Sequence, residues 1–295
     1  MLDGQAKMRA VGIVGAGEIG SGVAHQFAQL FPEVVLVDIS EDALGAARER
    51  IRQSARMQRM LRAAPSTDVL ERVSFTTKAE LLRNVEFIVE NVTEDVNIKR
   101  DVYSKLDTIC APNVIFAANT SAIPIVTIAS YTTRPSSVIG LHFMNPVTLS
   151  RAVEVITGPA TSKFTRDTAI QIIRALGKEA IVVSDCAGFV SNRSLMLMIN
   201  EAIATVADGV APPSEVDRVF RECFGHPMGP LETADLIGLD TVLRTLRVLS
   251  YHYGGLKFSP SKLLISMVGQ GCCGRKNAKG FYEYSDTTAV RGHPC

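Results

Sequence analysis

A histidine interrupts an apolar run near the middle of the chain. The run is VIGLHFMNPV, residues 138–147, and it places His142 among Val, Ile, Leu and Phe before Asn145 and Pro146 break the pattern. Histidine is the side chain that most readily exchanges a proton near neutral pH, so His142 is a candidate general base. A hydrogen-bonded histidine of the core is the ordinary alternative.

A carboxylate follows this histidine twelve positions later. Glu154 lies in the apolar segment AVEVI, and a charge buried there needs a partner. The histidine falls near the end of one predicted strand and the glutamate falls in the next, which favours a His142–Glu154 pair. Such a carboxylate fixes the tautomer of the imidazole and stabilises the imidazolium that forms when the ring takes up a proton.

A glycine-rich turn near the N-terminus indicates a nucleotide site. The segment VGIVGAGEIGSG holds Gly15, Gly17 and Gly20, with Glu18 and Ile19 between the last two. It follows a strand-like run and opens a helix, which is the context of a dinucleotide-binding turn. Its glycines allow the tight turn, the approach of a pyrophosphate and close packing of helix and strand.

Asp38 ends the second strand-like run and completes this pattern. A carboxylate about 20 residues after the turn can bind the adenosine ribose hydroxyls. A turn or helix-capping aspartate is the alternative. Because a carboxylate repels a 2′-phosphate, and because Ile39 and Ser40 add no positive charge, the sequence predicts NAD in preference to NADP.

Charge and cysteine usage exclude several classes of protein. The 295 residues carry a formal net charge of +1, which argues against nucleic acid as the main partner. The six cysteines form no C-x-x-C pair and have no metal-ligand spacing with the five histidines, so we expect free thiols and no metal. The first residues resemble no signal peptide, and no apolar stretch has membrane-spanning length. We expect a cytoplasmic protein without a membrane partner.

Strand-like and helix-like segments alternate through the first 185 residues. The strands read as continuous apolar runs, which is typical of a mostly parallel sheet covered by helices on both faces. After Asp185 only helical patterns follow. We therefore predict an α/β domain over 1–185, an all-helical domain over 186–285 and a tail over 286–295. The predicted strands are 10–15, 33–38, 85–91, 114–120, 137–144, 152–158 and 180–185.

Several blocks together resemble the 3-hydroxyacyl-CoA dehydrogenase family, and most closely its stand-alone 3-hydroxybutyryl-CoA type. They are GLHFMNPV…VEVI, NTSAI, CAGFVSNR, HPMGPLETADLIGLDT and GRKNAKGFYEY, collinear across nearly the whole chain. The resemblance implies a Rossmann-like doubly wound domain, a helical C-terminal domain, a homodimer and NAD-linked oxidation of an L-3-hydroxyacyl thioester, as in fatty acid metabolism.

The resemblance also implies roles for single residues. His142 and Glu154 match the catalytic histidine and its carboxylate. Ser121 and Asn192 match polar residues that contact the reacting oxygen, the substrate and the cofactor, although either could be a helix or turn cap. The positions that match residues near NAD are Asn145, Glu94, Lys99 and Lys276, and Glu94 with Lys99 could instead be a surface pair.

The substrate side departs from the family pattern. Ser54 matches a position near CoA, but Leu61 stands where a CoA-contacting lysine is common, with Arg59 and Arg62 on either side as possible substitutes. The residues 148–151, TLSR, replace the usual PVMK, and Ala122 replaces a second serine. The surrounding basic stretch, 48–62, is either a solvated helix face or a site for a phosphate.

These departures leave the substrate open. A CoA thioester is favoured. The alternative is the same chemistry on a short polar 3-hydroxyacyl group held by an acyl carrier protein in a biosynthetic, polyketide-type pathway. Remoter alternatives are a dehydrogenase of free hydroxy or sugar acids and a non-enzymatic nucleotide-binding protein.

Overall fold

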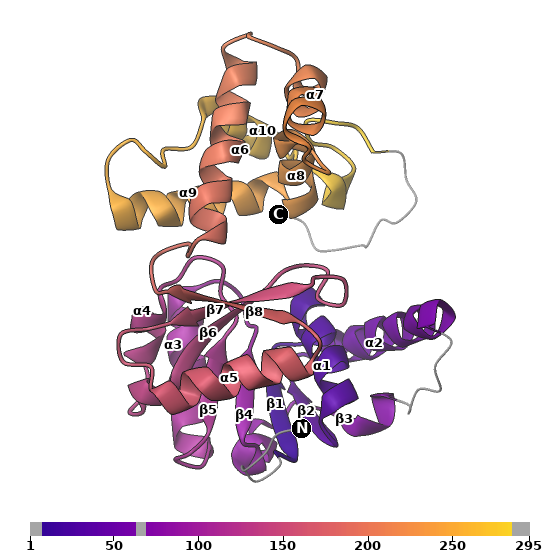
Figure 1. Cartoon of the computed structure of the whole chain (residues 1–295), viewed down its shortest axis with the longest axis vertical. Coiled ribbons are helices and arrows are strands. Elements are labelled where there is room, and N and C mark those ends of the chain that lie inside the picture. Colours follow the sequence, from indigo (N-terminus) through magenta and orange to yellow (C-terminus); the bar gives the residue numbers. More distant parts are fainter. Residues whose placement is uncertain (1–7, 63–68, 285–295) are drawn as a thin grey trace. The chain divides into compact units, whose positions relative to one another are not determined.

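A computed structural model describes residues 8–62 and 69–284 of the chain. The predicted tail, 286–295, lies outside the described residues. The chain divides into two compact units, with the boundary between Cys186 and Ala187. In Figure 1 the first unit runs from indigo through magenta to red and holds the sheet, and the second runs on to yellow and is helical.

The first unit is built on one eight-stranded sheet. Its strand order is β3-β2-β1-β4-β5-β6-β7-β8, so the order reverses between β1 and β4. All pairs are parallel except β6 with β7. The strands are β1 Ala10–Val14, β2 Glu33–Val37, β3 Val73–Thr76, β4 Phe87–Glu90, β5 Ile115–Ala118, β6 Val138–Phe143, β7 Ala152–Thr157 and β8 Glu179–Ser184. The predicted mostly parallel, doubly wound sheet is confirmed.

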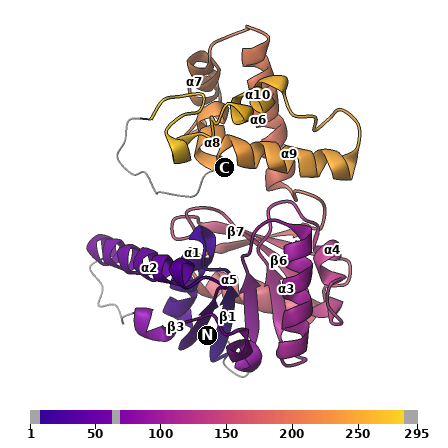
Figure 2. The same ribbon diagram turned by 180° about the vertical axis from the view of Figure 1, so that it is seen from behind.

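Helices cover both faces of this sheet. Side chains of α1, α2 and α5 share one hydrophobic core with β1, β6 and β7. On the other face Tyr103 of α3 packs edge-on against Phe116 of β5, with ring centroids 6.0 Å apart. Figure 1 shows α5 in front of the sheet, and Figure 2 shows α3 in front of the opposite face. The helices are α1 Glu18–Leu30, α2 Glu41–Arg62, α3 Val96–Ile109, α4 Ile125–Ala129 and α5 Lys163–Ala175.

Two features of the sheet add to the sequence prediction. The strand β3 was not expected, because its four residues VSFT are only partly buried and give a weak apolar signal. The strands β6 and β7 run antiparallel, although both have continuous apolar runs. Only residues 144–151 connect them, and a parallel crossover needs about a dozen residues or more.

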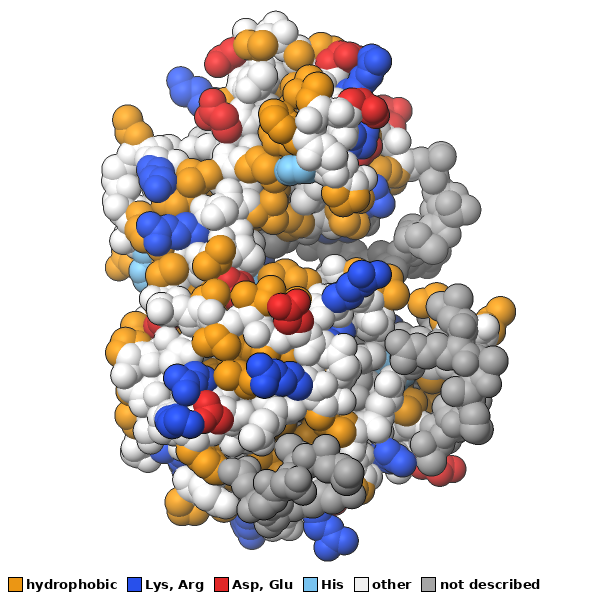
Figure 3. All heavy atoms as spheres, in the orientation of Figure 1, with side chains coloured by type: hydrophobic (Ala, Val, Ile, Leu, Met, Phe, Trp, Pro, Cys, Tyr) orange, Lys and Arg blue, Asp and Glu red, His pale blue; other side chains and the backbone are white. Residues whose placement is uncertain are grey.

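The second unit is helical around its own apolar core. Leu231, Leu243 and Phe258 are among the side chains buried in it. On the face shown in Figure 3, acidic and basic side chains are interspersed. Among the described residues no helix combines the length and apolar character needed to cross a membrane. The helices are α6 Ser191–Ala207, α7 Pro213–Phe224, α8 Pro230–Ile237, α9 Leu239–Tyr253 and α10 Lys262–Gly269.

A buried ion pair joins β4 to the helix that follows it. The Nζ of Lys99 on α3 donates to both carboxylate oxygens of Glu90, at 2.8 and 2.9 Å, and both residues are fully buried. Burial raises the pKa of the Glu90 carboxyl, and the neighbouring ammonium opposes that shift. Each charge therefore depends on the other for its stability inside the fold.

We expect Lys99→Met to lower the free energy of unfolding by about 3–5 kcal/mol, because it leaves Glu90 buried without its cation. Urea denaturation measures this loss. Lys105→Met, an exposed change on the same helix, should stay within about 0.5 kcal/mol. Glu90→Gln combined with Lys99→Met should recover part of the loss, and equal losses in the single and double variants would contradict the pairing.

Candidate active site

His142 and Glu154 face each other across the antiparallel strand pair. They are register partners on β6 and β7, and their side chains point to the same face. The Nδ1–H of His142 donates to Oε2 of Glu154 at 3.1 Å, and both residues are less than a tenth exposed. Because an ionised carboxylate can only accept a hydrogen bond, this contact places the ring proton on Nδ1 and makes Nε2 the basic nitrogen of the ring.

Two asparagines tie together the carboxyl ends of the central strands. Asn91 follows β4 and donates its backbone N–H to Val14 of β1, at 2.7 Å. Asn119 follows β5, and its Nδ2 donates to Oδ1 of Asn91 at 2.8 Å. The Oδ1 of Asn119 accepts the backbone N–H of Phe143 at 3.1 Å, directly after His142. The network lies where the strand order reverses, the usual position of a ligand in such sheets.

The glycine-rich turn has the geometry that its sequence predicts. Gly15 has a φ of +95°, and a Cβ there would lie 2.7 Å from the backbone oxygen of Asn91. A Cβ on Gly20 would lie 1.9 Å from the oxygen of Gly15, so only glycine allows this close packing. A Cβ on Gly17 would meet no atom within 4 Å. The turn is thus open at Gly17, where a pyrophosphate needs to approach the backbone.

Asp38 lies at the end of β2 and holds the same turn. Its Oδ2 accepts the N–H of Ala16 at 2.7 Å, and its Oδ1 accepts the N–H of Ser40 at 2.9 Å. Each carboxylate oxygen can accept a further donor, so these bonds are compatible with ribose binding. The donor set and the open turn therefore fit a bound dinucleotide.

Glu94 holds the loop that carries Ser121. Its Oε1 accepts from the hydroxyl of Thr120 at 2.6 Å and from the backbone N–H groups of Ser121 and Ala122, both at 2.9 Å. Lys99 lies 3.9 Å from the other carboxylate oxygen but is committed to Glu90. Glu94 and Lys99 are therefore not a surface pair, and Lys99 can influence the site only through its neighbours.

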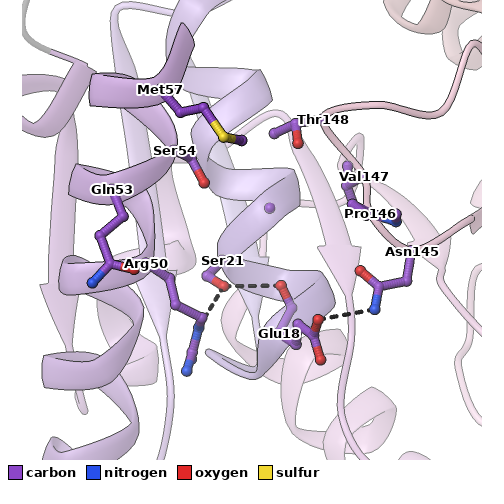
Figure 4. A pocket seen from close by; sticks show the side chains of 11 residues that line it. Glu18, Ser21, Arg50, Gln53, Ser54, Met57, Asn145, Pro146, Val147 and Thr148 are labelled. Carbon is purple, nitrogen blue, oxygen red and sulfur yellow. Dashed lines mark hydrogen bonds between the residues drawn. The ribbon is translucent and has the colours of Figure 1, made fainter. Parts of the chain in front are cut away.

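A cavity of about 300 Å³ opens beside α1, the helix that follows the glycine-rich turn (Figure 4). Ser54 on α2 lines it, together with side chains of α1 and the segment after β6. Asn145 closes one side, and its Nδ2 donates to Oε1 of Glu18 at 2.9 Å. The lining residues are Glu18, Ser21, Gly22, Arg50, Gln53, Ser54, Met57, Asn145, Pro146, Val147 and Thr148.

A buried lysine fixes the backbone of the segment 144–151, which contributes to the cavity wall. Lys178, which precedes β8, donates its Nζ to the backbone oxygens of Val147, at 2.7 Å, and Ser150. It is 7% exposed, and burial lowers the pKa of its ammonium. Val147 in turn packs on Gly22, where an added Cβ would come within 3.0 Å of it. The loop after His142 is thereby fixed from both sides.

Two of the remaining predicted site residues belong to the second unit. Asn192 is the second residue of α6, in the second unit. Lys276 lies in a 3₁₀ helix, Arg275–Asn277, of the same unit, and its Nζ pairs with Oδ1 of Asp240 at 2.5 Å. The side chains of Arg59 and Arg62 lie outside the described part of the structure.

Sequence reasoning did not single out Arg50, Lys178, Asn91 and Asn119. Arg50 lies in the basic stretch considered as a phosphate site, so a signal for it existed. Lys178 bonds to backbone oxygens, which every sequence offers alike, so no signal could have identified it. Asn91 and Asn119 lie at the carboxyl ends of the predicted strands 85–91 and 114–120, and that position is a usable signal.

Comparisons with known proteins agree with this geometry. Residues 10–186 match the family model described as the NAD binding domain of 3-hydroxyacyl-CoA dehydrogenase, and residues 188–284 match that of its C-terminal domain. The chain is 39% identical over 286 residues to the probable 3-hydroxybutyryl-CoA dehydrogenase of Bacillus subtilis, covering 96% of this chain and 100% of that protein. It is 42% identical over 276 residues to the corresponding probable enzyme of Deinococcus radiodurans, with 92% and 99% covered.

Solved structures extend the comparison to the fold. The crystal structure of (S)-3-hydroxybutyryl-CoA dehydrogenase from Ralstonia eutropha matches with a TM-score of 0.89 and 38% identity. The match covers 95% of this chain and 100% of that one. The resemblance that the sequence motifs predicted is confirmed.

We expect Glu94→Ala to loosen the Ser121 loop, because it leaves the donors of Thr120, Ser121 and Ala122 without their acceptor. The free energy of unfolding should fall by about 1–3 kcal/mol, and the amides of Ser121 and Ala122 should exchange hydrogen faster. Glu94→Gln keeps a carbonyl acceptor and should have a smaller effect. Unchanged exchange at Ser121 in Glu94→Ala would contradict this role.

Proposed function

We propose that this chain, which belongs to the 3-hydroxyacyl-CoA dehydrogenase family and is an NAD-dependent oxidoreductase, interconverts 3-hydroxyacyl and 3-oxoacyl thioesters. In this proposal His142 is the general base and Glu154 is its partner. The observation that carries this assignment is the buried hydrogen bond between Nδ1 of His142 and Oε2 of Glu154, at 3.1 Å.

In the oxidative direction, Nε2 of His142 takes the proton of the substrate hydroxyl. When bound, NAD supplies the chemistry of hydride acceptance. The negative charge of Glu154 stabilises the imidazolium as it forms, and the antiparallel strands prevent the ring from turning away. In the reductive direction the same imidazolium returns its proton to the carbonyl oxygen.

Other residues of the chain orient the reactants in this proposal. Ser121, fixed by Glu94, and Asn192 at the start of α6 are hydrogen-bonding residues for the reacting oxygen. Gly15, Gly17 and Gly20, with Glu18 and Ile19, form the pyrophosphate turn, and Asp38 binds the ribose. Asn145 and Lys276 remain proposed cofactor contacts, supported by their match to the family pattern.

The thiol carrier of the acyl group, here called the thioester handle, is proposed to be CoA. Relatives named as 3-hydroxybutyryl-CoA dehydrogenases support this choice, and Ser54 lines a cavity of suitable position. A carrier-protein thioester is the second candidate, because Thr148, which also lines that cavity, belongs to the TLSR segment that departs from the family. Comparing kcat/KM for one acyl group on CoA and on a carrier protein tests the choice. A clear preference for the carrier would overturn it.

The homodimer belongs to the same proposal. The second unit exposes large apolar side chains, with Val210 at 73% and Phe224 at 67%, and such surfaces commonly become interfaces. Sedimentation equilibrium should give twice the monomer mass, and a monomer at assay concentrations would contradict the proposal.

We expect His142→Gln to lower kcat by about 10²- to 10⁴-fold, the usual contribution of a general base. NAD affinity should barely change, because the histidine lies outside the glycine-rich turn. Steady-state kinetics and NADH titration measure the two quantities. Near-normal turnover in this variant would dismiss the base assignment.

We expect Glu154→Gln to slow turnover as well, because the neutral amide no longer favours the imidazolium. The limb of the kcat–pH profile that reports protonation of the ring should move to lower pH. A profile with the same limbs as that of the unmodified enzyme would show that Glu154 acts only as packing.

A further inference from the structure

Arg50 places a cation on the wall of the cavity with only neutral groups to hold it. Its Nε donates to the hydroxyl of Ser21 at 3.0 Å (Figure 4). Its Nη2 donates to the backbone oxygen of Ala16 at 2.7 Å. Among the described residues it takes part in no ion pair. A partly buried guanidinium without a carboxylate is suited to bind an anion.

The neighbouring arginines of α2 are engaged in other contacts. The guanidinium of Arg48 stacks on the ring of Phe75, 4.5 Å from its centroid. Arg52 pairs with Glu49 at 2.5 Å. Of these three arginines, only Arg50 lines the cavity.

The rest of the cavity indicates what accompanies the anion. Gln53 and Ser54 offer hydrogen bonds beside the guanidinium, and Met57 and Val147 add apolar surface. The volume equals that of about ten waters at ~30 Å³ each. This space suits a phosphate ester with part of an aliphatic arm.

We propose that Arg50 binds the phosphate that carries the pantetheine arm of the thioester substrate. This inference rests on the proposed function and specifies its substrate class. The enzyme then recognises the phosphopantetheine portion, which CoA and carrier proteins share, in preference to the adenosine 3′-phosphate. Leu61, where the family pattern has a CoA-contacting lysine, is consistent with that shift.

The same guanidinium also lies beside the glycine-rich turn, through Ala16. A phosphate of NAD is therefore the competing source of the anion, and the experiment has to separate the two sources. Reduction of acetoacetyl thioesters by NADH does so when the handle is shortened stepwise, from CoA to dephospho-CoA, 4′-phosphopantetheine and pantetheine. The unmodified enzyme is compared with Arg50→Gln, Arg50→Lys and the control Arg52→Gln.

For the unmodified enzyme, kcat/KM for the first three handles should agree within about fivefold, the range of an exposed ion pair. The pantetheine thioester should be poorer by about 10- to 100-fold, the contribution of a charged hydrogen bond. Arg50→Gln should lose this preference for the phosphate and keep its KM for NADH. Arg50→Lys should keep part of the preference, and Arg52→Gln should keep all of it.

Two results would overturn the proposal. One is a kcat/KM for the dephospho-CoA thioester that is about 10- to 100-fold lower than that for the CoA thioester. The other is an Arg50→Gln variant that raises the KM for NADH and weakens all four thioesters equally. Calorimetric binding of 4′-phosphopantetheine and pantetheine separates this inference from the proposed function. A phosphate preference that depends on Arg50, without thioester turnover, would refute only the proposed function.

Discussion

Burial of His142 and Glu154 in the sheet is a constraint that the first unit satisfies by the hydrogen bond between the two side chains. Both side chains lie inside an apolar sheet, where neither a charge nor a free imidazole is stable without a partner. The antiparallel pairing of β6 and β7 brings them into register. That pairing follows from the short connection, 144–151, which leaves no room for a crossover helix.

The same connection links the His142–Glu154 pair to the cavity beside α1. It begins directly after His142, contributes Asn145 and Val147 to the cavity, and is held from beneath by Lys178. A displacement of this loop would therefore move the cavity wall and the strand end together. The buried Lys178 thus fixes the backbone of the segment that lines the cavity.

The sequence could predict the parts of this site that depend on side-chain pattern. Continuous apolar runs indicated the central strands, and the spacing of Gly15, Gly17 and Gly20 indicated the turn, which its φ angle and close contacts now explain. Contacts to backbone were not predictable, because carbonyl and amide groups carry no sequence signal. Lys178 is one case, and the hold of Glu94 on the Ser121 loop is another. The pairing of Lys99 with Glu90 was also not predictable. Glu90 lies across a strand-to-helix turn, so the two residues have no helical spacing that would indicate a contact.

The buried polar pairs of the sheet and the polar side chains around the cavity differ in how far they can be substituted without loss of the fold. In the sheet, Glu90 with Lys99 and Glu154 with His142 are paired within buried surroundings, so a change in one member removes a buried partner of the other. On α2 the guanidinium of Arg50 is partly exposed and bound to neutral groups, and the TLSR segment is fixed through its backbone. Side chains there can be exchanged with little effect on the core. This difference explains how the chain can keep the His142–Glu154 pair while residues around the cavity depart from the family pattern.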